Sequence, residues 1–314
     1  MKRFLYIIAV VTLCFAAGSC AQEDPLKEKS VIVDSPLTMN DFDRWLEANY
    51  LKPYNIEFKY RYALNESDMG YYTVPAKYEA AIIYAHLVKY LCIDTYDEIA
   101  GVDFTRGYFP KMFFLIGAWE YRNNGSFVLG TAEAGKKIML AGVNDLPLYF
   151  EYYEGDELGD NLNYYYIKTI HHEFTHILNQ NKEFADAFKQ VTSSTYVSDA
   201  CFDTDEYWRG RGYITAYAQS EPREDFAELL SEYVTHTAEW WAEQIAAADS
   251  ETANVRESNP SAPNGATLIE SKIDIVRNYM NDSWDIDIDK LRDIIGRRMN
   301  DVVSGRVDLN TVEL

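Results

Sequence analysis

The feature that most constrains this chain is the pentapeptide HEFTH at His172–His176. A helix brings side chains four residues apart onto one face, so both imidazoles of the pentapeptide can reach one metal ion. Apolar residues occupy a different stripe of the same helix, namely Ile170, Phe174 and Ile177. We therefore expect a helix that packs against the core on one side and binds Zn²⁺ on the other.

Glu173 indicates hydrolytic chemistry rather than a purely structural metal site. It follows the first histidine and can reach a water molecule on the metal. Zinc lowers the pKa of such a water towards about 7, and a carboxylate beside it can accept the proton. A structural zinc has no use for this acid. The alternative interpretation of the segment is a helix with exposed histidines.

Two neighbouring observations limit the ligand set. His171 lies about 100° around the helix from His172, so we expect it to pack or to face solvent. Two histidines leave a zinc site one protein ligand short. The metzincin pattern would place glycine and histidine three and six residues after His176, but those positions hold Asn179 and Lys182. The third ligand must therefore come from a later segment.

The strongest candidate for the third ligand is Glu224. Pro222 suits the first turn of a helix, and Glu228 lies four residues after Glu224 on the same face. We predict that Glu224 binds zinc and that Glu228 orients a ligand histidine through its other ring nitrogen. Without the HExxH motif, compensation of the helix dipole would explain these acids equally well. The alternatives for the third ligand are Asp225, Glu221 and, less strongly, His236.

The first residues are typical of a bacterial lipoprotein signal peptide. Lys2 and Arg3 precede an apolar stretch, Leu5–Ala17, that is too short to span a membrane in the mature protein. We predict removal of the signal peptide at 1–19 and lipidation of Cys20. Residues 20–35 then form a flexible tether. The folded part would be extracytoplasmic and lipid-anchored, at the outer membrane or the cell surface. An ordinary signal peptide with an incidental cysteine is the alternative.

Charge and cysteine content exclude some classes of partner. Without residues 1–19 the chain has 27 basic and 50 acidic residues, a formal net charge of −23. Such a surface repels a phosphate backbone, so we expect no nucleic-acid partner. Outside the cytoplasm a disulfide between Cys92 and Cys201 is permitted, but their spacing gives no positive sign of one.

The order of apolar patterns predicts an α+β fold. In the first half we expect helices at 41–49 and 75–90, a turn at 123–125, and strands at 54–62, 111–116, 126–130 and 136–143. In the second half we expect a loop at 249–266 and helices at 164–180, 222–246, 268–280 and 288–303. A small mixed sheet followed by a helical C-terminal part indicates one domain, residues 36–305.

The third-ligand segment resembles that of the anthrax lethal factor-like gluzincins. Tyr217 stands seven residues before Glu224, and the sequence continues EDFAE through Glu228. In that group the tyrosine helps to stabilise the oxyanion, so the resemblance implies this catalytic role for Tyr217. A phenol can donate a hydrogen bond to developing negative charge, which agrees with the role.

A longer stretch, from about Asp41 to Thr237, is similar to the zinc-binding metallopeptidase lipoproteins of glycan-foraging gut bacteria. The segments that carry this similarity are Lys52–Ile56, Phe109–Lys111, Leu129–Glu133 and Thr169–Phe174. Similar proteins repeat the double histidine at His171. Asn179 departs from the family pattern, because a histidine that supports a ligand sometimes stands there.

Together these features predict a zincin-like catalytic domain with zinc as cofactor. The expected activity is hydrolysis of peptide bonds by a zinc-activated water with Glu173 as general base, on a peptide, protein or glycoprotein substrate. The alternative is a non-catalytic zinc-containing surface lipoprotein that binds peptides or glycans. The tyrosine-rich stretch Tyr149–Tyr166 motivates that alternative, because aromatic faces suit such ligands.

Overall fold

The computed structural model describes residues 38–66, 73–121, 127–128, 130–133, 136–202 and 206–313, without the side chains of 122–135, 199 and 202–205. The chain divides into two units, Met1–Met39 and Asn40–Leu314, and every element below belongs to the second. The predicted signal peptide at 1–19, the tether at 20–35 and the turn at 123–125 lie outside the described residues.

Short helices precede and connect the first strands. They are α2 (Asp41–Leu46), η1 (Glu47–Leu51), α3 (Lys52–Tyr54), η2 (Leu64–Glu66), α4 (Tyr78–Leu87), η3 (Val88–Ile93), α5 (Asp94–Ala100) and α6 (Val102–Tyr108). The predicted strand at 54–62 was too long. Asn55 adopts a left-handed conformation with φ 55° and ends the helix at Tyr54, so strand β1 covers only Glu57–Lys59.

The central sheet has four strands in the order β1, β2 (Met112–Leu115), β6 (Lys137–Leu140) and β5 (Gly130–Glu133). The first three are parallel, and β5 is antiparallel to β6. Alternate residues of β2 face opposite sides. Phe113 enters the main core, whereas Phe114 packs in a small cluster with Ile116 and Met139. Strands β3 (Glu120–Tyr121) and β4 (Phe127–Val128) form a separate antiparallel pair.

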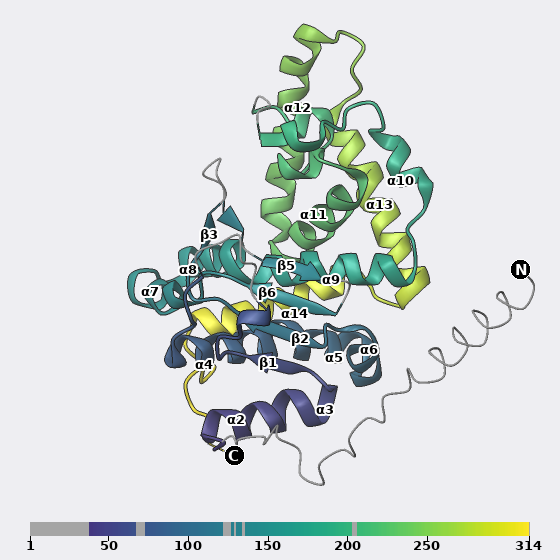
Figure 1. Ribbon diagram of the computed structural model, residues 1–314. Coiled ribbons are helices and arrows are strands. Elements are labelled where there is room, and N and C mark those ends of the chain that lie inside the picture. Colours follow the sequence, from purple (N-terminus) through teal and green to yellow (C-terminus); the bar gives the residue numbers. More distant parts are fainter. Residues whose placement is uncertain are drawn as a thin grey trace, which may run out of the picture. The chain divides into compact units, whose positions relative to one another are not determined.

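The rest of the chain is helical (Figure 1). Between the sheet and the pentapeptide helix lie η4 (Val143–Asp145), α7 (Leu146–Tyr152), α8 (Gly155–Leu162) and η5 (Asn163–Ile167). The pentapeptide helix is α9 (Lys168–Asn181), followed by α10 (Asp186–Val191), η6 (Ser198–Phe202), η7 (Arg209–Arg211) and η8 (Tyr217–Gln219). The chain ends with α11 (Pro222–Thr235), α12 (Ala238–Ser258), α13 (Gly265–Trp284) and α14 (Ile288–Val303).

Two predictions about the helical part were wrong. The single helix at 222–246 is broken, because the Thr237 side chain accepts a hydrogen bond from the backbone of Trp240 and starts a new helix, α12. The loop at 249–266 is short, since α12 continues to Ser258 and buries Thr252. Gly265 begins α13 against the backbone of η7, where an added Cβ would lie 2.3 Å from the carbonyl oxygen of Arg209.

Helix α9 is held by its apolar stripe. Phe174 is fully buried, and its ring centroid lies 4.8 Å from those of both Tyr96 and Phe109. Ile170 and Ile177 on the same stripe are also buried, as the sequence predicted. Helix α9 contacts both strand β5 and helix α11, which lie near it in Figure 1. This packing fixes the rotation of α9 and turns its histidine face towards α11.

The predicted fold class is therefore confirmed. The protein is α+β, with a small mixed sheet, a central helix that carries HExxH and a helical C-terminal part. The domain bounds 36–305 stay a prediction.

Candidate metal centre

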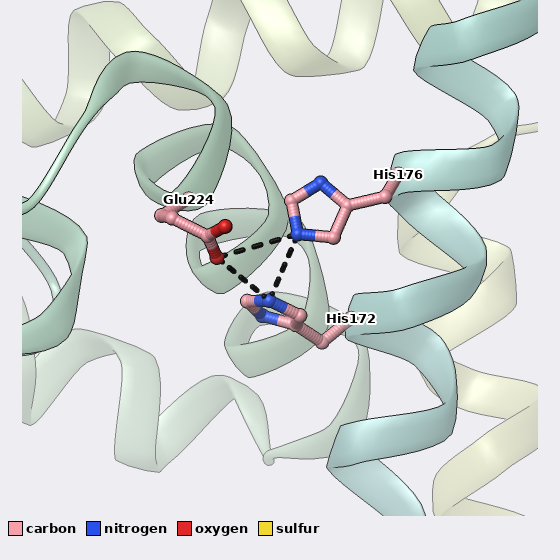
Figure 2. A group of neighbouring side chains, drawn as sticks. All are labelled: His172, His176 and Glu224. Carbon is pink, nitrogen blue, oxygen red and sulfur yellow. Dashed lines mark hydrogen bonds and ion pairs between the residues drawn. The ribbon is translucent and has the colours of Figure 1, made fainter. Parts of the chain in front are cut away.

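Helix α9 presents the two histidines of the pentapeptide side by side (Figure 2). The ring centroids of His172 and His176 are 4.8 Å apart, and their Nε2 atoms are 3.1 Å apart. Two unprotonated ring nitrogens at this distance would direct their lone pairs at each other. The pair therefore needs a proton or a cation between the rings.

Glu224, in the first turn of α11, completes a triangle of donor atoms. Its Oε2 lies 3.0 Å from His172 Nε2 and 3.3 Å from His176 Nε2 (Figure 2). Tetrahedral zinc with ligand bonds of about 2.0–2.2 Å separates its ligand atoms by about 3.3–3.6 Å. Two imidazole nitrogens and a carboxylate oxygen at nearly this spacing fit zinc. Among the residues that the structure describes, they form the one cluster of this kind.

Glu228 lies one helical turn beyond Glu224 and contacts the other side of His172. Its Oε1 is 2.8 Å from His172 Nδ1, although the direction is not that of an ideal hydrogen bond. This is the arrangement that the sequence predicted for the residue that orients a ligand histidine. Glu228 is only 4% exposed, so its carboxylate must be satisfied by protein groups.

The charges of the centre depend on one another. Burial alone raises the pKa of Glu224, but hydrogen bonds from His172 and His176 outweigh it and lower the pKa to about 2. Burial likewise lowers the pKa of His172, but its close contacts with the carboxylates of Glu224 and Glu228 raise it to about 10. A proton on His172 thus balances the carboxylates in the metal-free protein, and a cation can replace it.

The two predicted catalytic residues border the same triangle. Tyr217, in η8, is about one-third exposed, with its ring centroid 6.3 Å from that of His172. Burial raises the pKa of the Tyr217 phenol well above its ordinary value, and the charges of Glu224, Glu228 and Glu173 raise it further. The charge of Glu173 also raises the pKa of His172. The half-buried Glu173 therefore lies near both His172 and Tyr217.

The alternatives for the third ligand lie elsewhere. Asp225 is fully buried and forms an ion pair with Lys272, 2.5 Å between Oδ2 and Nζ. Glu221 is exposed at the start of α11. His236 contacts Glu232, 3.1 Å from its Oε2. Only Glu224 joins the two histidines.

His171 points away from the centre into the core. It is 1% exposed, and its Nδ1 lies 3.1 Å from the Tyr96 hydroxyl. Burial lowers the pKa of this imidazole to about 3, so the ring is neutral. We expected His171 either to pack or to face solvent, and in the structure it packs. Cys92 also lies beside His171 and forms no disulfide with Cys201.

Two polar residues around Glu228 were not found from the sequence. Lys168 lies four residues before His172, and this spacing on one helix face was a usable signal. Thr215 lies in an irregular segment before η8, and no local pattern marks it. Both donate hydrogen bonds to the Glu228 carboxylate.

Fold and site together define a protein of the HExxH class, in which a carboxylate from a later helix lies beside the two histidines. Residues 35–289 match a family described as "Putative zinc-binding metallo-peptidase". The chain belongs to this family, as its sequence motifs indicated, and zinc agrees with the predicted cofactor. No protein of the curated set matches the chain.

A solved structure supports the same assignment. It is described as a "putative zinc-binding metallo-peptidase from Bacteroides caccae", and its sequence is 33% identical to this chain. The similarity has a TM-score of 0.70 and covers 90% of this chain and all of the solved one.

Proposed function

We propose that this protein is a zinc-dependent metallopeptidase of the gluzincin type, a hydrolase of peptide bonds. The observation that carries the proposal is the triangle of His172 Nε2, His176 Nε2 and Glu224 Oε2, with separations of 3.0–3.3 Å. The presence of Glu173 beside this triangle favours catalysis over a structural metal. Membership of a metallopeptidase family supports the same class.

Each residue has a definite task in this proposal. His172, His176 and Glu224 hold the metal. Zinc, when bound, polarises a carbonyl group and makes water acidic at neutral pH. Glu173 accepts the proton of the attacking water and passes it to the leaving amine. Tyr217 donates a hydrogen bond from its phenol, which its raised pKa keeps protonated, to the oxyanion that develops on the substrate carbonyl.

The substrate class follows from the same chemistry and is a peptide, protein or glycoprotein. Glu173→Gln is the matched test variant, because the amide keeps the size of the side chain and removes its basicity. Zinc-loaded protein is incubated with broad peptide and glycopeptide libraries, and new termini are detected by mass spectrometry. We expect cleavage by the wild type and a loss of about 10²–10⁴ in rate with Glu173→Gln. Zinc-loaded wild type that cleaves nothing would leave a binding lipoprotein instead.

We also propose that Cys20 carries a lipid and anchors the protein to a membrane, at the outer membrane or cell surface. The small residues Ala17, Gly18 and Ser19, which lead directly into Cys20, support this. Among the described helices, none combines the length and apolarity that crossing a bilayer requires. Metabolic labelling with a fatty-acid analogue should mark the wild type and leave Cys20→Ala unlabelled. Equal labelling of both would exclude this anchor.

A further inference from the structure

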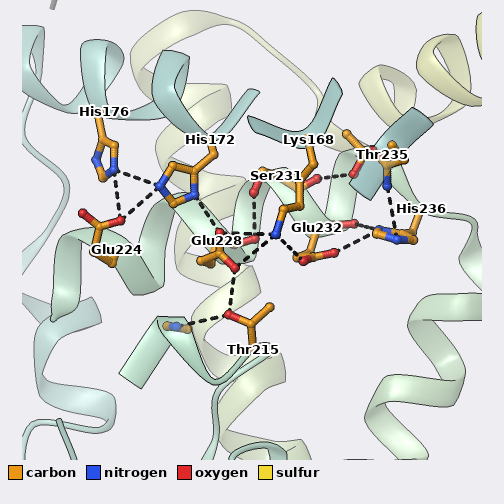
Figure 3. Close-up of polar contacts among 12 residues, drawn as sticks. Lys168, His172, His176, Thr215, Glu224, Glu228, Ser231, Glu232, Thr235 and His236 are labelled. Atoms are coloured by element: carbon orange, nitrogen blue, oxygen red, sulfur yellow. Dashed lines mark hydrogen bonds and ion pairs between the residues drawn. The ribbon is translucent and has the colours of Figure 1, made fainter. Parts of the chain in front are cut away.

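Two facing rows of polar side chains, one on α9 and one on α11, extend inward from the metal centre (Figure 3). Helix α9 contributes Lys168, His172 and His176, each four residues after the last, and α11 contributes Glu232, Glu228 and Glu224 in reverse order. Lys168 contacts Glu232, His172 contacts Glu228, and His176 contacts Glu224. The helices therefore run antiparallel at this interface, with the metal ligands at one end and a lysine at the other.

The two oxygens of Glu228 have different partners. Oε1 is 2.8 Å from His172 Nδ1, and Oε2 accepts a hydrogen bond of 2.7 Å from the Thr215 hydroxyl. Lys168 Nζ lies 3.3 Å from Oε2 and 3.5 Å from Oε1. Rotation of the carboxylate would break the contact with Thr215 and move Oε1 away from the imidazole. Thr215 thus favours the orientation in which Oε1 contacts His172, and Lys168, which contacts both oxygens, holds the carboxylate in place.

Lys168 is itself fixed in place. Its closest partner is Glu232, at 2.9 Å, and its side chain is only 12% exposed. Glu232 is buried and also contacts His236 Nδ1 at 3.1 Å. Glu228 and Glu232 are one turn apart on α11, so without the lysine two buried carboxylates would repel each other. The ammonium group therefore keeps both near α9.

Thr215 reaches Glu228 from a different part of the chain. Its Oγ1 accepts a hydrogen bond of 3.1 Å from the backbone N–H of Ala218 while its hydroxyl proton goes to Glu228. This short turn leads directly into η8, which carries Tyr217. The uncharged Thr215 hydroxyl therefore links the Glu228 carboxylate, which contacts His172, to the segment that carries Tyr217.

We propose that Lys168 and Thr215 are positioning residues that hold Glu228 against His172 and thereby set the zinc affinity of the centre. This inference rests on the proposed zinc function. Groups that orient ligand histidines typically change metal affinity by 10–100-fold when they are removed. The two residues act on the Glu228 carboxylate from independent elements, so each should have its own effect.

The test measures the zinc dissociation constant of the full-length protein by competition with a chromophoric chelator. Lys168→Met and Thr215→Val remove the donors with little change of volume, and Lys168→Arg and Thr215→Ser retain them. Lys137→Met is the matched control. Lys137 is 3.3 Å from Glu66, as Lys168 is from Glu228, and the two lysine side chains are 11% and 12% exposed. Glu66 pairs otherwise with Lys59.

We expect Lys168→Met and Thr215→Val each to weaken zinc binding by about 10–100-fold. The arginine and serine variants should recover most of the affinity, and Lys137→Met should stay within about twofold of wild type. Unfolding of the metal-free variants is measured in parallel, so that a loss of fold is not mistaken for a loss of affinity. If Lys168→Met does not fold, Thr215→Val decides the question, because it removes no charge.

Two outcomes would overturn the inference in distinguishable ways. Folded Thr215→Val with the affinity of wild type would show that Glu228 needs no such support, and the proposed function would stand. Wild type that binds no zinc at all would remove the proposed function, and this inference with it.

Discussion

Two adjacent acids on α11, Glu224 and Asp225, have opposite environments. The Asp225 carboxylate is paired with the Lys272 ammonium at 2.5 Å and accepts a hydrogen bond of 2.7 Å from Tyr196. Lys272 also donates to the carbonyl oxygen of Gly212 at 2.8 Å. Glu224 instead faces only the imidazoles of α9 and a tyrosine. The fold gives Asp225 a buried ammonium partner, whereas Glu224 faces histidines with which it can share a cation.

The difference shows how one helix serves both stability and chemistry. Burial raises the pKa of Asp225 and lowers the pKa of Lys272, so each group alone resists ionisation and needs the other. This pair fastens α11 to α13. The neighbouring residue, Glu224, lies 100° around the helix and is then held at the metal position by a pair to which it does not belong.

The largest expected effect is on zinc binding, after substitution of Glu224. Glu224→Ala should abolish stoichiometric zinc binding, because it removes one of the three proposed protein ligands. The free energy of unfolding of the metal-free protein should fall by the contribution of the ion pairs that Glu224 forms with the two histidines, which is present above pH 4.5. Elemental analysis and denaturant unfolding of the same samples measure both quantities. Full zinc content in this variant would show that another residue is the third ligand.

Substitution of Asp225 should instead cost stability without removing a proposed metal ligand. Asp225→Ala leaves Lys272 buried without its partner and should cost about 3–5 kcal/mol of stability. Glu221→Ala is the matched control, because it removes an acid from the exposed start of the same helix and should change stability by no more than about 0.5 kcal/mol. Equal stability of the two variants would refute the division of α11 into two faces.

A third substitution separates metal binding from catalysis. Tyr217→Phe keeps the ring and removes the hydroxyl, so zinc content should be unchanged. On a peptide substrate found with the wild type, kcat should fall by about 10²–10³. Steady-state kinetics measures this effect, and a change confined to KM would assign Tyr217 to substrate binding instead.

The metal-free centre should also show a pH dependence of stability. The folded pKa of His172, about 10, is raised above its ordinary 6.5, so its stabilising contribution is complete below pH 6.5 and is lost as pH rises towards 10. The pKa of Glu224, about 2, is lowered from 4.5, so its contribution is present above pH 4.5 and is lost as pH falls towards 2. The metal-free centre should therefore stabilise the fold most between pH 4.5 and 6.5.

The same proton should compete with zinc. Between pH 6.5 and 10 zinc must displace it from His172, so the affinity should rise by about tenfold per pH unit. Calorimetric titration in buffers of different ionisation enthalpy should detect about one proton released per zinc. No dependence on buffer or pH in this range would mean that His172 is neutral in the metal-free protein.

The sequence could predict those site residues that follow helical spacing. The histidines, Glu224 and Glu228 follow a four-residue period, and the structure brings them together. Lys168 follows the same period, so the prediction could have included it. Thr215 could not be found, because a residue in an irregular segment gains its partner only from the tertiary fold. The prediction of a loop at 249–266 was wrong for a similar reason. Its sequence is polar, but α12 continues into it because Thr252 is buried by the tertiary fold.

The most direct test of the metal centre is X-ray diffraction from crystals of the zinc-loaded protein, with data collected on both sides of the zinc absorption edge. The account predicts one anomalous peak at about 2.0–2.2 Å from His172 Nε2, His176 Nε2 and a carboxylate oxygen of Glu224. A peak coordinated by Asp225 or His236 instead, or stoichiometric zinc with no peak at this triangle, would contradict it.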